Sequence, residues 1–147
     1  MHSVRSQYVA SAVATVGPAR LLTMLYDRML LDVDRAVTCF RSGQRVDGTQ
    51  HLVHAQEIVA ELMVSLQVDA WDGGAQLMSI YRYLLAELIE AGVKGDAERA
   101  VACRDLILPL AEAWQEAADQ LARTASAGVG ATPTRDTVMS ARLLGVG

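Results

Sequence analysis

Aromatic residues are scarce in this sequence, at 5% of 147 residues, although 52% of the residues are hydrophobic. The hydrophobic excess consists of alanine, leucine and valine, a composition that favours packed helices over the strands of a sheet. A chain of this length has room for one domain and buries roughly two-thirds of its unfolded surface, so its core needs no disulfide or metal for support. The composition therefore predicts a single all-α domain.

Positive charge is in short supply as well. The net charge is −4 and the pI is about 5.3, without the basic excess of a nucleic-acid-binding protein. No stretch approaches the roughly 18 uncharged apolar residues of a membrane span, and the start, MHSVRSQYVAS, lacks the apolar core of a secretory signal. Cys39 and Cys103 match no metal-binding spacing and are expected to be reduced, buried thiols. We therefore expect a cytoplasmic protein that binds no nucleic acid and does not insert into a membrane.

Motifs for catalysis are missing. The patterns GxxxxGK, GxSxG and HExxH do not occur, and GVGATP near the end lacks the third glycine and the preceding strand of a dinucleotide-binding loop. Asp32 and Asp34 lie two residues apart on a predicted helix, so they point apart and are expected to face solvent. The sequence therefore predicts no enzyme activity and no cofactor.

Histidine leaves one alternative open. His51 and His54 lie one helical turn apart and Glu57 follows a turn later, so one helix face would present all three. A metal needs more ligands than this face supplies, and the Glu-x-x-His pairs of a di-iron bundle do not occur. We therefore favour a solvated helix face and expect no bound metal. The competing interpretation is a metal-binding bundle protein that uses these three residues. Metal analysis of the purified protein separates the two.

The spacing of apolar residues predicts four helices, in the ranges 18–41, 49–66, 75–91 and 97–125. Gly17 and Pro18 mark the first helix start, because the fixed φ of proline suits the first helical position. Pro109 falls inside the last helix and predicts a kink or a short break there.

Glycine and a capping acid predict the connections. Gly43 and Gly48 are expected to bound the first turn, Gly92 is expected to end the third helix, and Asp96 is expected to cap the fourth. Short links between four helices predict an antiparallel four-helix bundle. The bundle, with a mobile N-terminal arm, is expected to occupy residues 1–125, and a flexible C-terminal tail residues 126–147.

The first predicted helix and the residues before it carry a resemblance to a known family. The residues that carry it are Tyr8, Val13, Thr15, Pro18, Leu21, Leu22 and the run MLYD at 24–27. This order resembles the N-terminal signature of FliS, the flagellin-specific export chaperone of bacterial flagella. HLVHAQEIVAELMVSL, LMSIYRYLLAELIEAG and AEAWQEAA resemble the later helices of that family, so the resemblance covers residues 8–118. The sequence departs from the residues usual in the family at Gly17, Arg28 and Gly92. These departures affect local helix caps and one part of the rim of the binding groove.

The resemblance implies a chaperone of flagellar type III export. Such a protein binds the disordered C-terminal segment of flagellin as helices along its bundle, prevents premature polymerisation in the cytoplasm, and presents flagellin to FlhA at the export gate. It needs no cofactor or nucleotide. Tyr8 is implied to dock the arm and to take part in export-gate recognition. The other implied partner-binding residues belong either to the groove or to the core behind it: Leu21, Leu22, Leu25, Tyr26, Leu62, Leu66, Tyr81 and Tyr83.

The sequence leaves the partner, the oligomeric state and the role of the tail open. The same apolar surface would also suit a helical adaptor for another protein partner, and the oligomeric state is not set by the sequence. Trp114 falls in register with the core of the last helix, and Trp71 is expected to cover the end of the bundle. The segment VMSARLLGVG in the tail either folds back over an empty groove or is a frayed end.

Overall fold

The computed structural model describes residues 17–70 and 72–130, with side chains up to residue 127. Within these residues the chain forms four α-helices and no strand, which confirms the predicted all-α bundle. The elements are α2 (Pro18–Arg41), α3 (Arg45–Ser65), the short 3₁₀ helix η1 (Val68–Ala70), α4 (Gly74–Lys94) and α5 (Ala97–Gly130). None of the helices in these ranges combines the length and apolar content that a membrane span requires.

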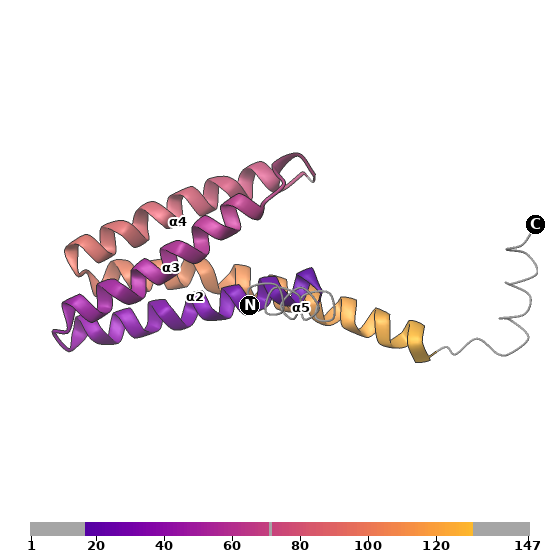
Figure 1. The fold of residues 1–147 in the computed structure, drawn as a ribbon, viewed down its shortest axis with the longest axis horizontal. Helices are drawn as coiled ribbons and strands as arrows, with labels where there is room; N and C mark the ends of the chain where they lie inside the picture. The colour runs from indigo at the N-terminus through magenta and orange to yellow at the C-terminus, as the bar shows by residue number, and fades with distance from the viewer. Residues whose placement is uncertain (1–16, 71, 131–147) are drawn as a thin grey trace, which may run out of the picture.

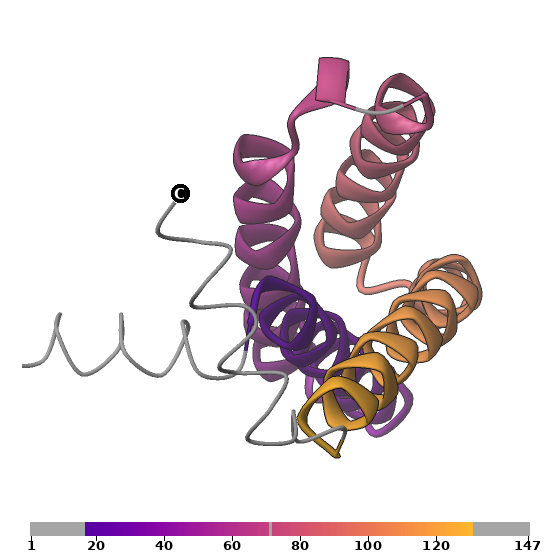
Figure 2. The same cartoon turned by 90° about the vertical axis from the view of Figure 1, so that its right-hand side faces the viewer.

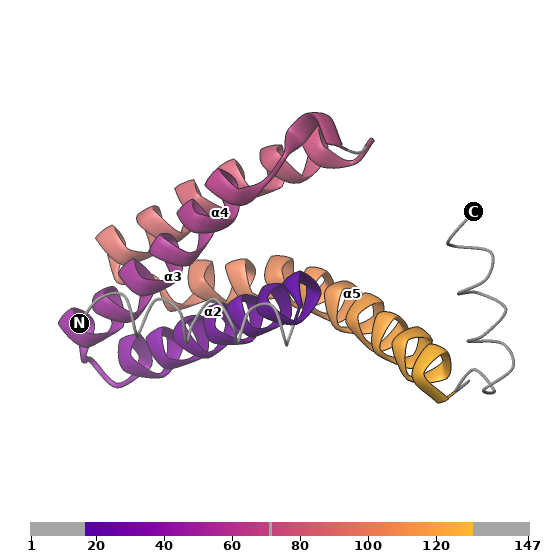
Figure 3. The ribbon, with the colours of Figure 1, turned by 45° about the vertical axis from the view of Figure 1, so that its right-hand side comes forward.

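The helices form a four-cornered bundle. α2 packs along both α3 and α5, and α4 packs on α3 and, less extensively, on α5. Seen end-on, the α3–α4 pair lies above the α2–α5 pair (Figure 2). The two pairs diverge toward the end where α2 begins and α3 ends, and α5 continues beyond the bundle at that end (Figures 1 and 3). The divergence exposes inward-facing side chains at one end of the core.

The core is built mainly from leucine, alanine and valine, as the composition predicts. The largest core side chains, each at most 2% exposed, include Tyr26, Tyr81, Met29, Leu52, Leu84, Leu88 and Ile107. Cys103 is buried and Cys39 half-buried, and both are free thiols. Burial raises the pKa of the Cys103 thiol to about 12, so this side chain is a protonated, unreactive part of the core.

Several predicted helix ends are confirmed. Pro18 occupies the start of α2, and Gly17 precedes it with a φ of 84°, a conformation that glycine adopts at low cost. Asp96 accepts a hydrogen bond from the Arg99 backbone N–H at 3.1 Å, which makes it the side-chain cap of α5.

Gly48 was expected to lie in the turn before the second helix and Gly92 to end the third, and both instead lie inside helices. α3 begins at Arg45 rather than near Thr49, and Gly48 is buried in its first turn. A Cβ on Gly48 would lie 2.5 Å from the Phe40 ring, so glycine is needed there for close helix packing. Gly92 is likewise buried inside α4, which ends at Lys94 with Gly95 in the left-handed conformation. Both predictions were wrong because a glycine that allows close helix packing looks the same in sequence as a glycine in a turn or at a helix end.

The last helix was expected to kink or to break briefly at Pro109 and to end before Ser126. α5 is continuous across Pro109, so no break occurs there, although the helix changes direction along its length (Figures 1 and 3). It extends to Gly130, past Ser126, where the tail was expected to begin. Tyr8 and the arm, Trp71, and the tail from residue 131 lie outside the described residues, so the expectations for them remain predictions.

Candidate functional site: an apolar pocket at the open end of the bundle

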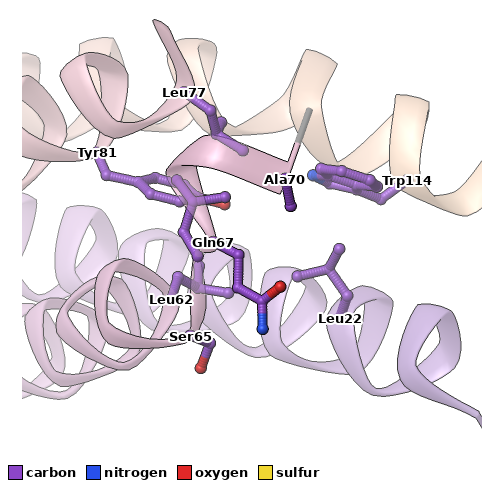
Figure 4. A pocket seen from close by; sticks show the side chains of 9 residues that line it. Leu22, Leu62, Ser65, Gln67, Ala70, Leu77, Tyr81 and Trp114 are labelled. Carbon is purple, nitrogen blue, oxygen red and sulfur yellow. The ribbon is translucent and has the colours of Figure 1, made fainter. Parts of the chain in front are cut away.

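A cavity of about 320 Å³ lies where the helix pairs diverge. Every element of the bundle contributes to it. The lining residues are Leu22 from α2, Leu62 and Ser65 from α3, Leu66, Gln67 and Ala70 from the α3–α4 connection, Leu77 and Tyr81 from α4, and Trp114 from α5. Figure 4 shows Leu22 and Trp114 on one side of this pocket and Leu62 and Tyr81 on the other. Most of these side chains are apolar, so the pocket suits apolar side chains of a partner.

A pair of buried tyrosines lies beneath the pocket. The Tyr26 and Tyr81 hydroxyls are 2.7 Å apart and share a hydrogen bond in which either can donate. The bond joins α2 to α4, which are not neighbours in the bundle. Burial raises the pKa of both hydroxyls above their usual value, so both remain neutral at physiological pH. The pair therefore fixes two opposite helices directly below the open end.

Apolar side chains of α2 close in sequence to Leu22 are partly exposed. Leu22 and Leu25 are half-buried, and Leu21 and Met24 are 38% and 57% exposed. Leu25 follows the lining residue Leu22 by nearly one turn and shares its face of α2, whereas Met24 points to a different side of the helix. An apolar pocket with half-buried apolar side chains around it is the kind of surface that accepts one face of an amphipathic segment. The geometry supports binding of a peptide and places no nucleophile and general base together in this pocket.

Comparison with known proteins assigns the family. The family model described as "Flagellar protein FliS" matches residues 1–121. The chain belongs to the FliS family. Three relatives are each called "Flagellar secretion chaperone FliS". The Bacillus subtilis (strain 168) protein is 24% identical over 75% of this chain and 82% of its own length. The Escherichia coli (strain K12) protein is 29% identical over 74% of this chain and 81% of its own length.

The third relative, from Salmonella typhimurium (strain LT2), is 28% identical over 74% of this chain and 82% of its own length. FliS is a family of chaperones and not of enzymes, which confirms the expectation that this FliS-family chain is not an enzyme.

The structure brings four of the nine partner-binding residues implied for a FliS protein together around the pocket. Those that line the pocket are Leu22, Leu62, Leu66 and Tyr81. Tyr26 lies beneath them in the core, and Leu21 and Leu25 lie on α2 beside Leu22. Tyr83 is 61% exposed and lies instead on a shallow groove between α4 and α5, so it does not join the others.

Sequence reasoning did not select some lining residues. Trp114 was assigned to the core, but it is half-buried and lines the pocket. Leu77 lies one turn before Tyr81 on α4, and this spacing could have identified it. Ser65 follows Leu62 by three residues on α3, so the same helical spacing could have identified it. Gln67 and Ala70 carry no such signal, because their positions depend on how the α3–α4 connection folds.

The histidine cluster of this FliS-family chain does not form a metal site in the described residues. There, no three His, Cys, Asp or Glu side chains converge to hold an ion. His54 instead bonds the carboxylate of Asp32 on α2, while His51 lines a separate shallow cavity beside Cys39. Asp32 also pairs with Arg28, at 3.3 Å, and is fully buried. The expectation that Asp32 faces solvent was therefore wrong, because Arg28 on its own helix and His54 on α3 both reach its buried carboxylate.

Removing the hydroxyl of Tyr81 tests the contribution of the tyrosine pair. Tyr81→Phe leaves the buried Tyr26 hydroxyl without this partner, so we expect the free energy of unfolding to fall by about 1–3 kcal/mol. Tyr83→Phe removes the same atom from a side chain that is 61% exposed, and is expected to change stability by less than about 0.5 kcal/mol. Urea denaturation of both variants measures the difference. Equal stabilities would show that the bond contributes nothing net.

Proposed function

We propose that this chain is a flagellar export chaperone that binds the disordered C-terminal segment of flagellin in the cytoplasm. It prevents premature polymerisation of flagellin and delivers it to FlhA at the export gate. Membership of the FliS family supports the chaperone role. The observation that carries flagellin binding is the apolar pocket of about 320 Å³ at the open end of the bundle, where Leu22, Leu66 and Trp114 are only half-buried.

The chemistry of the pocket fits a segment that folds as it binds. A disordered segment gains free energy by burying apolar side chains, and this gain must exceed the entropy lost when the segment becomes ordered. Leu22, Leu66 and Trp114 lie at the pocket partly exposed, so they are available for such contacts. By covering the apolar face of the bound segment, the chaperone replaces contacts that flagellin subunits would otherwise make with each other. This action needs no cofactor.

Calorimetric titration with the C-terminal segment of flagellin from the same organism tests the proposal. We expect saturable one-to-one binding, with a clearly negative heat capacity change because apolar surface is buried. A titration at several temperatures measures this change. If the chain does not bind the segment at all, even after removal of residues 131–147, the flagellin proposal is wrong and the pocket serves another partner, as in the adaptor alternative.

A further inference from the structure

We propose that the outer face of the α3–α4 pair binds a second copy of the same chain, so that a two-fold dimer forms with both pockets left open. The outer face is the side of α3 and α4 that points away from α2 and α5. Its exposed apolar row consists of Val46 and Val53 on α3 and Ile89 and Val93 on α4. The inference goes beyond the proposed function, because none of these four residues lines the pocket.

No other described element covers the outer face. Within residues 17–70 and 72–130, α3 packs on α2 and α4, and α4 packs on α3, α5 and η1. The end-on view shows α2 and α5 on one side of the α3–α4 pair and no described α-helix on the other (Figure 2). The four apolar side chains of the row are 43–71% exposed. Apolar side chains gathered on one uncovered face mark an interaction surface, whereas scattered ones do not.

One hydrogen bond shows that the α3 and α4 parts of the row border the same helix–helix seam. The Thr49 hydroxyl on α3 donates to the Gly92 carbonyl on α4 at 3.2 Å. Thr49 lies one helical turn from each valine of the row, and Gly92 lies beside one α4 residue of the row and one turn from the other. The four side chains therefore form a single apolar strip along the seam.

The same hydrogen bond fixes which residues lie at the same height along the two antiparallel helices. Counting from it in opposite directions, Val53 lies level with Leu88, next to Ile89. Val46 and Val93 lie within about 3 Å of the same height, at 1.5 Å per residue. A two-fold axis parallel to the helices places α3 of one copy on α4 of the other without changing these heights. Each apolar residue of the row then meets an apolar residue of the second copy.

Charges beside the row favour a second copy as the occupant. Residues 48–56 contain no Asp, Glu, Lys or Arg, and Glu57 follows Val53 by one turn on the same side of α3. Arg82 lies two turns before Ile89 on α4 and within about 3 Å of the height of Glu57. Both are exposed, and neither forms an ion pair with a described residue. The two-fold arrangement brings Arg82 of each copy toward Glu57 of the other, so the surface complements itself.

The size of the outer face sets the expected strength of the dimer. Residues 46–57 of α3 span about 17 Å at 1.5 Å per residue, and the face is two helices wide. A contact of this size lies at the lower end of the range for specific interfaces. We therefore expect a reversible dimer with a dissociation constant on the order of 10 μM.

Sedimentation equilibrium of the full-length chain, without any client, tests the proposal. We expect a monomer–dimer equilibrium that Ile89→Glu weakens at least about tenfold, because the carboxylate must be buried against an apolar side chain. The matched control is Leu31→Glu on α2, since Leu31 is 39% exposed and Ile89 is 45% exposed. The control is expected to keep the dissociation constant within about twofold of that of the unmodified chain. Circular dichroism checks that both variants keep their helices.

Exchanging the charges tests the arrangement of the two copies. Arg82→Glu and Glu57→Arg are each expected to weaken the dimer about fivefold, because like charges then face each other. The double variant is expected to restore the dissociation constant to within about twofold of that of the unmodified chain. Both side chains are exposed, so these variants do not disturb the core. A double variant as weak as the single ones would contradict the two-fold arrangement.

Three further results would overturn the proposal. A chain that stays monomeric at about fifty times the expected dissociation constant does not form this dimer. A dimer that Ile89→Glu leaves intact uses another surface. Equal weakening by Ile89→Glu and Leu31→Glu would show that the effect does not come from the outer face.

The relation to client binding is tested separately. Because the row lies outside the pocket, saturation with the flagellin segment should leave the dimer intact and load two segments on it. Dissociation of the dimer by the segment would place the contact between copies at the pocket and would contradict the proposal. If the segment does not bind, the proposed function fails, whereas sedimentation without the client still decides whether the outer face joins two copies.

Discussion

A chain carrying Leu66→Asp is expected to bind the C-terminal segment of flagellin at least about a hundredfold more weakly than the unmodified chain, equivalent to about 2.7 kcal/mol. Leu66 lines the pocket where α3 ends and is only half-buried there. A carboxylate at this position must lose its hydration when an apolar client side chain enters, and it removes an apolar contact as well. Calorimetric titration measures the loss.

Val64→Asp is the matched control for this variant. Val64 lies two residues earlier, in the last turn of α3, and is 84% exposed. Val64→Asp therefore adds the same charge to the same helix end, but outside the pocket. We expect its affinity to stay within about threefold of the unmodified chain. The backbone N–H of Leu66 donates to the backbone carbonyl of Leu62, and Leu66→Asp retains this hydrogen bond because it changes only the side chain. Equal affinities of the two variants would show that the pocket does not hold flagellin.

Leu84→Ala is expected to lower the free energy of unfolding by about 3 kcal/mol, within a range of roughly 2–5 kcal/mol. Leu84 is fully buried on the inner face of α4. Its truncation removes apolar burial and leaves a cavity, since close-packed neighbours collapse only partly into the space. Chemical denaturation monitored by circular dichroism measures the change.

The control is the same substitution outside the core. Leu121 is 60% exposed on α5, and alanine favours a helix at least as strongly as leucine does, so Leu121→Ala should change stability by less than about 0.5 kcal/mol. A loss as large as that of Leu84→Ala would mean that the exposed part of α5 is covered in solution. Similar small losses in both variants would contradict the core position of Leu84.

Local rules predicted the parts of the fold that depend on local chemistry. The start of α2 followed from Gly17 and Pro18, and the start of α5 from the capping carboxylate of Asp96. Each signal acts within one helical turn, so the sequence alone contains it. The apolar spacing gave the four helices of residues 17–70 and 72–130 for the same reason.

Features that depend on a distant neighbour could not be predicted in this way. Gly48 is inside a helix because the ring of Phe40 needs its space, and Asp32 is buried because His54 reaches it from the next helix. Neither partner is marked in the sequence around the residue. The balance between a buried and a solvated carboxylate is set by these tertiary contacts.

In the candidate site, too, some residues could be predicted from the sequence and others depend on tertiary contacts. Leu22, Leu62, Leu66 and Tyr81 were implied by resemblance to FliS, and the structure places them around one pocket. Tyr83 follows Tyr81 by two residues, and side chains at this spacing point to different sides of a helix. The roles of Trp114 and the α3–α4 connection depend on where the two helix pairs diverge, which no local pattern encodes.

The contact between the first and last helices of the bundle sets the order in which the molecule can be completed during synthesis. Among the helices of the described residues, α2 leaves the ribosome first but packs along α5, which leaves last. A nascent chain without α5 therefore contains α2, α3 and α4 but lacks Trp114 of the pocket lining. Contacts between distant segments form only after both have been made. The pocket thus becomes complete only when nearly the whole bundle has been translated, and an unfinished chaperone offers a client an incomplete binding surface.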